Sequence, residues 1–217
     1  MKQQLVIVGA GGFGRELYGL VHECVSDDTF DFKGFLALDK SELAAFDVDA
    51  AVLDPPEVYD PTPYDRFLLA IGHIEVRRRV VELLLGKGAQ FIQFIHATAV
   101  IARTARLGKG VVVYPFAVVS NQANVGDFVH LSLYASVGHD ARVDEYSLLA
   151  PYATLNGAAV IESEVFVSTH ATIAPERRVG ARSKISANSV VLHDVPPDSM
   201  VYGVPGKQAR LSAASRG

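Results

Sequence analysis

The chain of 217 residues has a single cysteine, Cys24, which excludes an internal disulfide and favours a reducing compartment. It has no excess of positive charge, because its formal net charge is -4, so it lacks the basic footprint of a protein that binds nucleic acid or an anionic membrane. No uninterrupted apolar run is long enough to cross a bilayer, and the run Leu5 to Val8 leads into a glycine loop rather than a signal-peptide cleavage site. These absences predict a cytoplasmic protein.

The first part of the chain alternates short β-rich runs with helical patterns, which is typical of a small parallel α/β domain. We expect this Rossmann-like domain to span residues 1–97. Four prolines among polar residues predict a loop over residues 54–63. Residues 91–95 fit either a last strand or a connector. The predicted strands are residues 5–8, 32–38 and 67–71, and the predicted helices are residues 15–25 and 75–85.

From Ile101 onward the sequence repeats every six residues. Stepping by six from Ile101 to Val191 gives sixteen positions, and each is Ile, Leu or Val. Small residues, mostly Ala, precede many of them by two positions. Helices and ordinary strands repeat their buried positions at other periods, and the strands of a β-sandwich repeat them every two residues. A solenoid with flat faces buries one aliphatic residue in every six. The sequence therefore predicts a parallel β-helix over about residues 101–195, within a second domain of residues 98–217.

Three faces of six residues make one coil of eighteen, so the sixteen repeats predict roughly five coils. Strands in successive coils should lie about 4.8 Å apart.

A glycine loop follows the first predicted strand and precedes the first helix, with Gly9, Gly11 and Gly14 in the spacing of the dinucleotide fingerprint. Alone, this pattern suggests NAD. The α/β part is too short for a full dinucleotide domain, however, and a nucleotide-diphosphate sugar carries the same pyrophosphate. Glycines let a phosphate approach, and the helix N-terminus supplies N–H groups. We expect substrate contacts from Gly11, Gly12, Phe13 and Gly14.

Other candidates for substrate binding follow the second and third strands. Asp39 follows the second strand, where it would meet a base or ribose, or act as a turn residue. Gly72, His73 and Arg77 follow the third strand, where ligands collect in parallel sheets. For His73 and Arg77 the alternative is a solvated helix start.

Four motifs together carry a resemblance to a known family: the glycine loop with Arg15 and Glu16, the run Ala70–His73, the run Val137–Asp140, and the run Val201–Lys207. In this order and spacing they resemble the left-handed β-helix, hexapeptide-repeat sugar O-/N-acyltransferases. That group includes sialic acid O-acetyltransferases and N-acetyltransferases of nucleotide-linked 4-amino-4,6-dideoxy sugars. The resemblance implies a left-handed coil and a homotrimer with acetyl-CoA between neighbouring β-helices. Phe13 departs from several relatives, which carry a histidine there, and so leaves the substrate open.

The resemblance implies that His139 is the general base of acyl transfer, with Asp140 holding its tautomer. Gly157 lies eighteen residues after His139, one full coil away. In relatives the amide of the matching glycine faces the thioester carbonyl, which would make Gly157 an oxyanion donor. The alternative is that Asn156-Gly157 is a tight corner favouring positive φ.

The resemblance also implies coenzyme contacts in the later coils, although small polar residues there fit corner positions equally well. These candidates are Gly157, Ser168, Thr169, Ala174, Gly203, Pro205 and Lys207.

The sequence leaves three functions open. The favoured one is acetyl-CoA-dependent N-acetylation of a nucleotide-linked 4-amino-4,6-dideoxy sugar. The near alternative is O-acetylation of sialic acid or another sugar hydroxyl. The third is a zinc lyase of the β-helix carbonic anhydrase type, which would need converging imidazoles. His130 and His170 lie at other phases of the repeat than His139, so we expect no metal.

Overall fold

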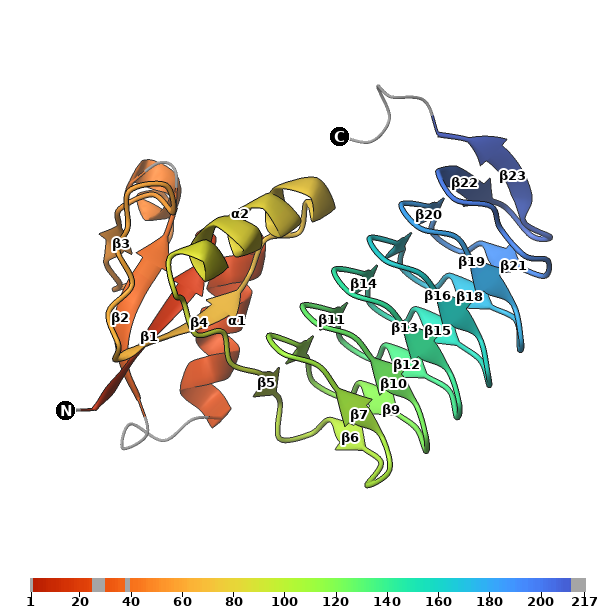
Figure 1. Cartoon of the computed structure of the whole chain (residues 1–217), viewed down its shortest axis with the longest axis horizontal. Coiled ribbons are helices and arrows are strands. Elements are labelled where there is room, and N and C mark those ends of the chain that lie inside the picture. The colour runs from red at the N-terminus through yellow and green to blue at the C-terminus, as the bar shows by residue number, and fades with distance from the viewer. Residues whose placement is uncertain (1, 25–29, 38–39, 212–217) are drawn as a thin grey trace. The chain divides into compact units, whose positions relative to one another are not determined.

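A computed structural model describes residues 2–24, 30–37 and 40–211 of the chain (Figure 1). The chain divides into two compact units, one ending at Phe94 and the other beginning at Ile95. Within the described ranges, no helix is both long enough and apolar enough to cross a membrane.

The first unit is built on a four-stranded sheet with the order β3-β2-β1-β4, in which all neighbours are parallel. The three longer strands and both helices were predicted. The two-residue strand β3 and a short 3-10 helix, η1, were missed because neither is long enough to show a period. The elements are β1 (Gln3–Val8), α1 (Gly12–Cys24), β2 (Phe30–Leu36), η1 (Lys40–Leu43), β3 (Val52–Leu53), β4 (Asp65–Leu69) and α2 (Ile74–Gly86).

The core of this unit surrounds the inner strand β1. Val6, Ile7 and Val8 are fully buried, as expected of a parallel strand with both faces covered. Leu17 of α1 and Leu84 of α2 are also fully buried. The apolar runs that predicted the strands are therefore the residues that form the core.

The second unit is a parallel β-helix, and this part of the predicted fold is confirmed. Each of the sixteen aliphatic positions is the second residue of a two-residue strand, from β6 to β21. Strands eighteen residues apart are neighbours, so Ser136 pairs with both Val118 and Thr154. The strands form three sheets, one for each face of the coil.

The strands of the coil are β5 (Phe94–Ile95), β6 (Val100–Ile101), β7 (Arg106–Leu107), β8 (Val112–Val113), β9 (Val118–Val119), β10 (Asn124–Val125), β11 (His130–Leu131), β12 (Ser136–Val137), β13 (Arg142–Val143), β14 (Leu148–Leu149), β15 (Thr154–Leu155), β16 (Val160–Ile161), β17 (Phe166–Val167), β18 (Thr172–Ile173), β19 (Arg178–Val179), β20 (Lys184–Ile185) and β21 (Val190–Val191). The last coil carries a hairpin that the repeat did not predict. Its strands are β22 (Ser199–Tyr202), parallel to β20, and β23 (Lys207–Arg210), antiparallel to β22.

The corners of the coil place non-glycine residues in the left-handed region, such as Tyr134 and Tyr152 with φ of 57° and 62°. At one series of corners the side chains stack: the ring centroids of Phe116, Tyr134, Tyr152 and His170 follow one another at 4.9, 4.8 and 4.6 Å. This spacing matches the rise of about 4.8 Å between strands. Ring stacking, worth about 0.5–1.5 kcal/mol per pair, therefore offsets part of the cost of the left-handed backbone.

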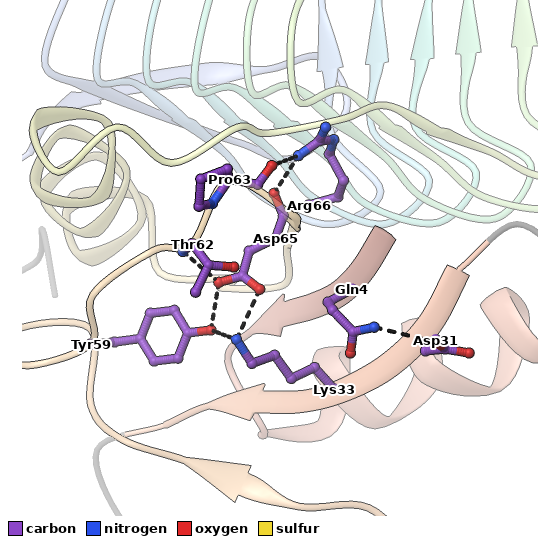
Figure 2. A network of polar contacts seen from close by, with 8 residues as sticks. All are labelled: Gln4, Asp31, Lys33, Tyr59, Thr62, Pro63, Asp65 and Arg66. Carbon is purple, nitrogen blue, oxygen red and sulfur yellow. Dashed lines mark hydrogen bonds and ion pairs between the residues drawn. The ribbon is translucent and has the colours of Figure 1, made fainter. Parts of the chain in front are cut away.

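A partly buried ion pair, in which the carboxylate is fully buried, fixes the loop over residues 54–63 in the first unit (Figure 2). The register of β2 against β1 slips at Lys33, which is left unpaired between Phe32 and Gly34, and such a bulge re-aims the side chain. Lys33 Nζ donates to Asp65 Oδ1 at 2.8 Å and to the Tyr59 hydroxyl at 2.7 Å. The Tyr59 hydroxyl in turn donates to Asp65 Oδ2 at 2.8 Å. The network joins β2, the loop and the start of β4.

Asp65 keeps its charge in this network although its side chain is fully buried. Burial acts to raise the pKa of Asp65, but hydrogen bonds from Lys33, the Thr62 N–H and Tyr59 outweigh it, so the pKa lies below its ordinary value. A lowered pKa means that the carboxylate stabilises the fold above its unfolded pKa of about 3.9, and that this contribution is lost as the pH falls through the folded pKa.

We predict that Lys33→Met lowers the free energy of unfolding by about 3 kcal/mol at neutral pH, because it leaves a buried carboxylate without its cation. The deficit should shrink as the pH falls, because burial without the cation raises the pKa of Asp65 in the variant, and it should be smallest below the lowered folded pKa of the wild type, where Asp65 is protonated in both proteins. Lys2→Met is the matched control, since Lys2 pairs with the exposed Asp31, and it should have a much smaller effect. Urea titrations at several pH values measure this, and equal effects of the two variants would contradict it.

Candidate active site

His139 lies at the corner that connects β12 to β13. Its Nδ1 lies 2.8 Å from Oδ2 of Asp140, whose own backbone is left-handed with φ of 59°. Since a carboxylate only accepts hydrogen bonds, this contact assigns the proton to Nδ1 and leaves the lone pair on Nε2. The His139 side chain is 69% exposed, so a ligand can reach the ring. The pair has the geometry of an oriented general base.

Gly157 lies against the imidazole ring of His139, on the next coil. A Cβ built at Gly157 would come within 2.5 Å of both Cε1 and Nε2 of the ring. The predicted alternative, a glycine required by positive φ, is wrong for this position. The left-handed residue of the corner is the next one, Ala158, with φ of 56°. Gly157 is therefore needed because the ring lies where its side chain would be.

The backbone amide of Gly157 differs from its neighbours. The amides of Asn156 and Ala158 donate to the carbonyls of Ile173 and His139, at 3.1 and 2.8 Å. Among the hydrogen bonds of the described residues, none is donated by the Gly157 N–H. The amide can therefore donate to a ligand oxygen, which an oxyanion hole requires.

A pocket of about 330 Å³ opens at the carboxyl ends of β1, β2 and β4 in the first unit. The glycine loop before α1 forms one side, and the turn between β4 and α2 forms another. Five of the residues predicted to bind substrate line it: Gly11, Gly12, Phe13, Gly72 and His73. The Nδ1 atom of His73 also accepts from the Val76 N–H, at 3.5 Å, and so caps α2.

Two other predicted substrate residues, Gly14 and Arg77, do not line the pocket. Gly14 faces the Gly9 carbonyl, which its Cβ would overlap, so this glycine allows α1 to pack closely against the end of β1. Arg77 is buried, and its Nε donates to the Ile71 carbonyl at 3.0 Å, which supports the turn behind the pocket. Asp39 lies outside the described residues.

Charged residues that the sequence analysis did not select also line the pocket: Glu42 from η1, Glu57 from the loop over residues 54–63, and Arg79 from α2. From the sequence, only the helical period could have distinguished Arg79 from Arg77, which lies two residues earlier in α2 and is buried. Glu42 and Glu57 lie in segments without a period, so their position depends on tertiary structure.

The predicted coenzyme residues lie at three places in the β-helix. Ala174 follows β18 at the same series of corners as His139 and Gly157, one coil further along. Ser168 and Thr169 follow β17 at a different series of corners, next to the stacked His170. Gly203 and Pro205 form the turn between β22 and β23, and Lys207 begins β23. Within the described part of the single chain, the structure brings only Gly157 and Ala174, of these candidates, near the corner of His139.

The histidines of the metal alternative are separated in the chain. His130 is buried in β11, His139 lies at the corner after β12, and His170 stacks on Tyr152. Among the residues that the structure describes, no group of three or more His, Cys, Asp or Glu could hold a metal ion.

Proteins of similar structure are found among those already solved. No protein-family model matches the chain, and no curated protein matches its sequence. The acetyltransferase domain of PglB from Neisseria gonorrhoeae, in complex with acetyl coenzyme A, is 26% identical with a TM-score of 0.85, over 96% of this chain and 100% of that one. PerB from Caulobacter crescentus, in complex with CoA and GDP-perosamine, is 25% identical with a TM-score of 0.84, over 95% and 97%. WeeI from Acinetobacter baumannii is 25% identical with a TM-score of 0.83, over 96% and 100%.

The chain has the fold of the perosamine- and PglB-type hexapeptide-repeat N-acetyltransferases. The resemblance drawn from the four sequence motifs is thereby confirmed. The likeness covers nearly all of this chain, including the unit that precedes the β-helix.

We predict that Gly157→Ala leaves the fold intact but lowers acetyl transfer from acetyl-CoA by about 10²-fold, because the new methyl group displaces the His139 ring by an ångström or more. The measurement is the initial rate of thiol release, with the unfolding midpoint as a check on folding. Gly19→Ala is the matched control: its Cβ meets open space inside α1, so it should keep full activity and gain about 0.5–1 kcal/mol in stability. Full activity in Gly157→Ala would contradict the assigned ring position.

Proposed function

We propose that this protein is an acetyl-CoA-dependent N-acetyltransferase that acts on a nucleotide-linked 4-amino-4,6-dideoxy sugar. The observation that carries the proposal is the His139–Asp140 pair, 2.8 Å apart, with Gly157 packed against the imidazole ring. The fold shared with PglB and PerB, solved with acetyl coenzyme A and with CoA and GDP-perosamine, supports it. PerB in complex with an amino sugar favours an amine over a hydroxyl as the acceptor.

In this mechanism the sugar amine attacks the thioester carbonyl of acetyl-CoA. Nε2 of His139 takes the proton from the amine, while Asp140 holds the Nδ1 proton and stabilises the imidazolium. The N–H of Gly157 donates to the oxyanion of the tetrahedral intermediate. The intermediate then collapses, and the C–S bond breaks to release CoA, whose thiolate takes up a proton. The proposed attack is direct and forms no acyl-enzyme, and the single cysteine, Cys24, belongs to α1 and not to the β-helix that carries His139.

A Rossmann-like domain over residues 1–97, which includes the whole first unit, would hold the nucleotide sugar. Its strand order β3-β2-β1-β4 matches the first four strands of that fold, and its pocket lies at the carboxyl ends of the strands. The pyrophosphate would bind the glycine loop at Gly11 and Gly12, where the N-terminus of α1 supplies N–H groups and a positive dipole. Gly72 and His73 would contact the sugar nucleotide from the other side of the pocket.

The β-helix, in residues 98–217, would be left-handed, as in the family that the sequence resembles. We place acetyl-CoA along the coils that follow His139, with Ala174 on the same corner and Ser168, Thr169 and the Gly203–Lys207 turn supplied by a neighbouring subunit. A homotrimer would cover the exposed His139, which a single chain leaves open to water. Both substrates are cytoplasmic metabolites, so the enzyme would act in the cytoplasm. Sedimentation of the purified protein tests the trimer.

We predict that His139→Ala lowers kcat for acetyl transfer by about 10²–10⁴-fold, because it removes the general base. His22→Ala is the control: this exposed histidine of α1 packs on Tyr18 in the other unit, and its loss should leave kcat unchanged. An unchanged kcat in His139→Ala would remove His139 from the mechanism.

The acceptor is tested with a panel of UDP-, dTDP- and GDP-linked 4-amino sugars and free sialic acid, each with acetyl-CoA and with thiol release as the readout. We expect turnover on at least one amino sugar and none on sialic acid. Turnover on sialic acid alone would contradict the N-acetyltransferase assignment.

A further inference from the structure

The loop over residues 54–63 forms a fixed wall of the nucleotide pocket although it has no regular structure. Its residues Pro56 and Glu57 line the pocket. Lys87, after α2, donates from Nζ to the carbonyls of Pro56, Glu57 and Tyr59, at 3.3, 2.6 and 3.0 Å. The Tyr59 side chain is held in addition by the buried network of Lys33 and Asp65 (Figure 2). A loop whose backbone carbonyls and Tyr59 side chain are both held in place is pre-organised to select a ligand.

Most of the pocket lining is apolar. Apolar side chains come from five segments around the carboxyl ends of the strands: Val8, Leu36, Pro56, Ile71 and Val80. The glycine loop and the N-terminus of α1 account for a pyrophosphate. What remains is an apolar slot that is also lined by two acidic residues, Glu42 and Glu57, and by Arg79 of α2. Such a combination suits a flat heterocycle whose polar edge donates hydrogen bonds.

The two carboxylates lie after different strands. Glu42 lies in η1, on the segment after β2, and an acidic residue of this segment meets ribose hydroxyls in parallel nucleotide-binding sheets. Glu57 follows β3 and is next to Pro56, which is buried in the apolar part of the wall. Glu57 is therefore the carboxylate available to the base.

We propose that this pocket selects a guanine nucleotide and that Glu57 is the residue that reads the base, an inference that rests on the nucleotide-sugar acceptor proposed above. An ionised carboxylate has acceptors only, in two parallel oxygens. Guanine presents two adjacent donors, N1–H and the N2 amino group, which match both oxygens. Uracil and thymine present one N–H between two carbonyls, and adenine and cytosine one amino group beside a lone pair, so each would place an acceptor against the carboxylate.

The test is calorimetric binding of GDP, UDP, dTDP and ADP to the full chain. We expect GDP to bind at least about tenfold more tightly than the other three, since only GDP makes two charge-assisted hydrogen bonds. Glu57→Gln should lose about tenfold in GDP affinity and leave UDP affinity unchanged, because an amide offers one acceptor and one donor. Glu82→Gln is the matched control: Glu82 is an exposed residue of α2 that pairs with Arg78, and this variant should bind GDP as the wild type does.

Equal or tighter binding of UDP or dTDP would overturn the guanine assignment, and so would a Glu57→Gln variant that weakens all four nucleotides alike. Either result leaves acetyl transfer through His139 standing. A guanine preference without any acetyl transfer would defeat the proposed reaction and leave the base assignment standing. If no nucleotide binds, the guanine assignment and the nucleotide-sugar acceptor fail together.

Discussion

The burial of one branched aliphatic side chain in every six residues is the constraint on which the second unit depends. Each strand of the coil has only two residues, too few to stand alone, and is stable because the inward side chain packs between the coils before and after it. Ile101 and Leu107 at the start of the stack are only half-buried, whereas the aliphatics from Val113 onward are buried. The repeat thereby imposes a register of eighteen residues on everything that the coil carries on its corners.

The candidate active site follows from that register. His139 and Gly157 lie one above the other on adjacent coils because they are eighteen residues apart. This position follows from the coil alone and does not by itself make either residue catalytic. Function enters at a corner where a glycine without left-handed φ lies against an exposed imidazole that is hydrogen-bonded to a carboxylate. A rigid scaffold holding a few unusual corner residues is how a repetitive fold acquires chemistry.

The parts that could be predicted from the sequence are those that repeat or match a spacing. The coil followed from its period, and the glycine loop from its position between a strand and a helix. The hairpin of β22 and β23 and the pocket residue Glu57 could not be predicted, because they depend on partners far away in the chain, such as Lys87 for the loop of Glu57. For Gly157 the spacing of eighteen residues indicated that it lies next to His139. The positive φ that was the alternative explanation for this glycine is found at Ala158 instead.

The central claim is that His139 accepts the proton of an amine that attacks acetyl-CoA. The most direct measurement is the distance between His139 Nε2 and the acceptor nitrogen in a crystal structure of the protein with CoA and a nucleotide-linked 4-amino sugar. We predict about 2.6–3.2 Å, with the coenzyme sulfur on the same corner and Asp140 still on Nδ1. An acceptor nitrogen bound out of reach of Nε2, with the coenzyme sulfur at another corner of the coil, would contradict it.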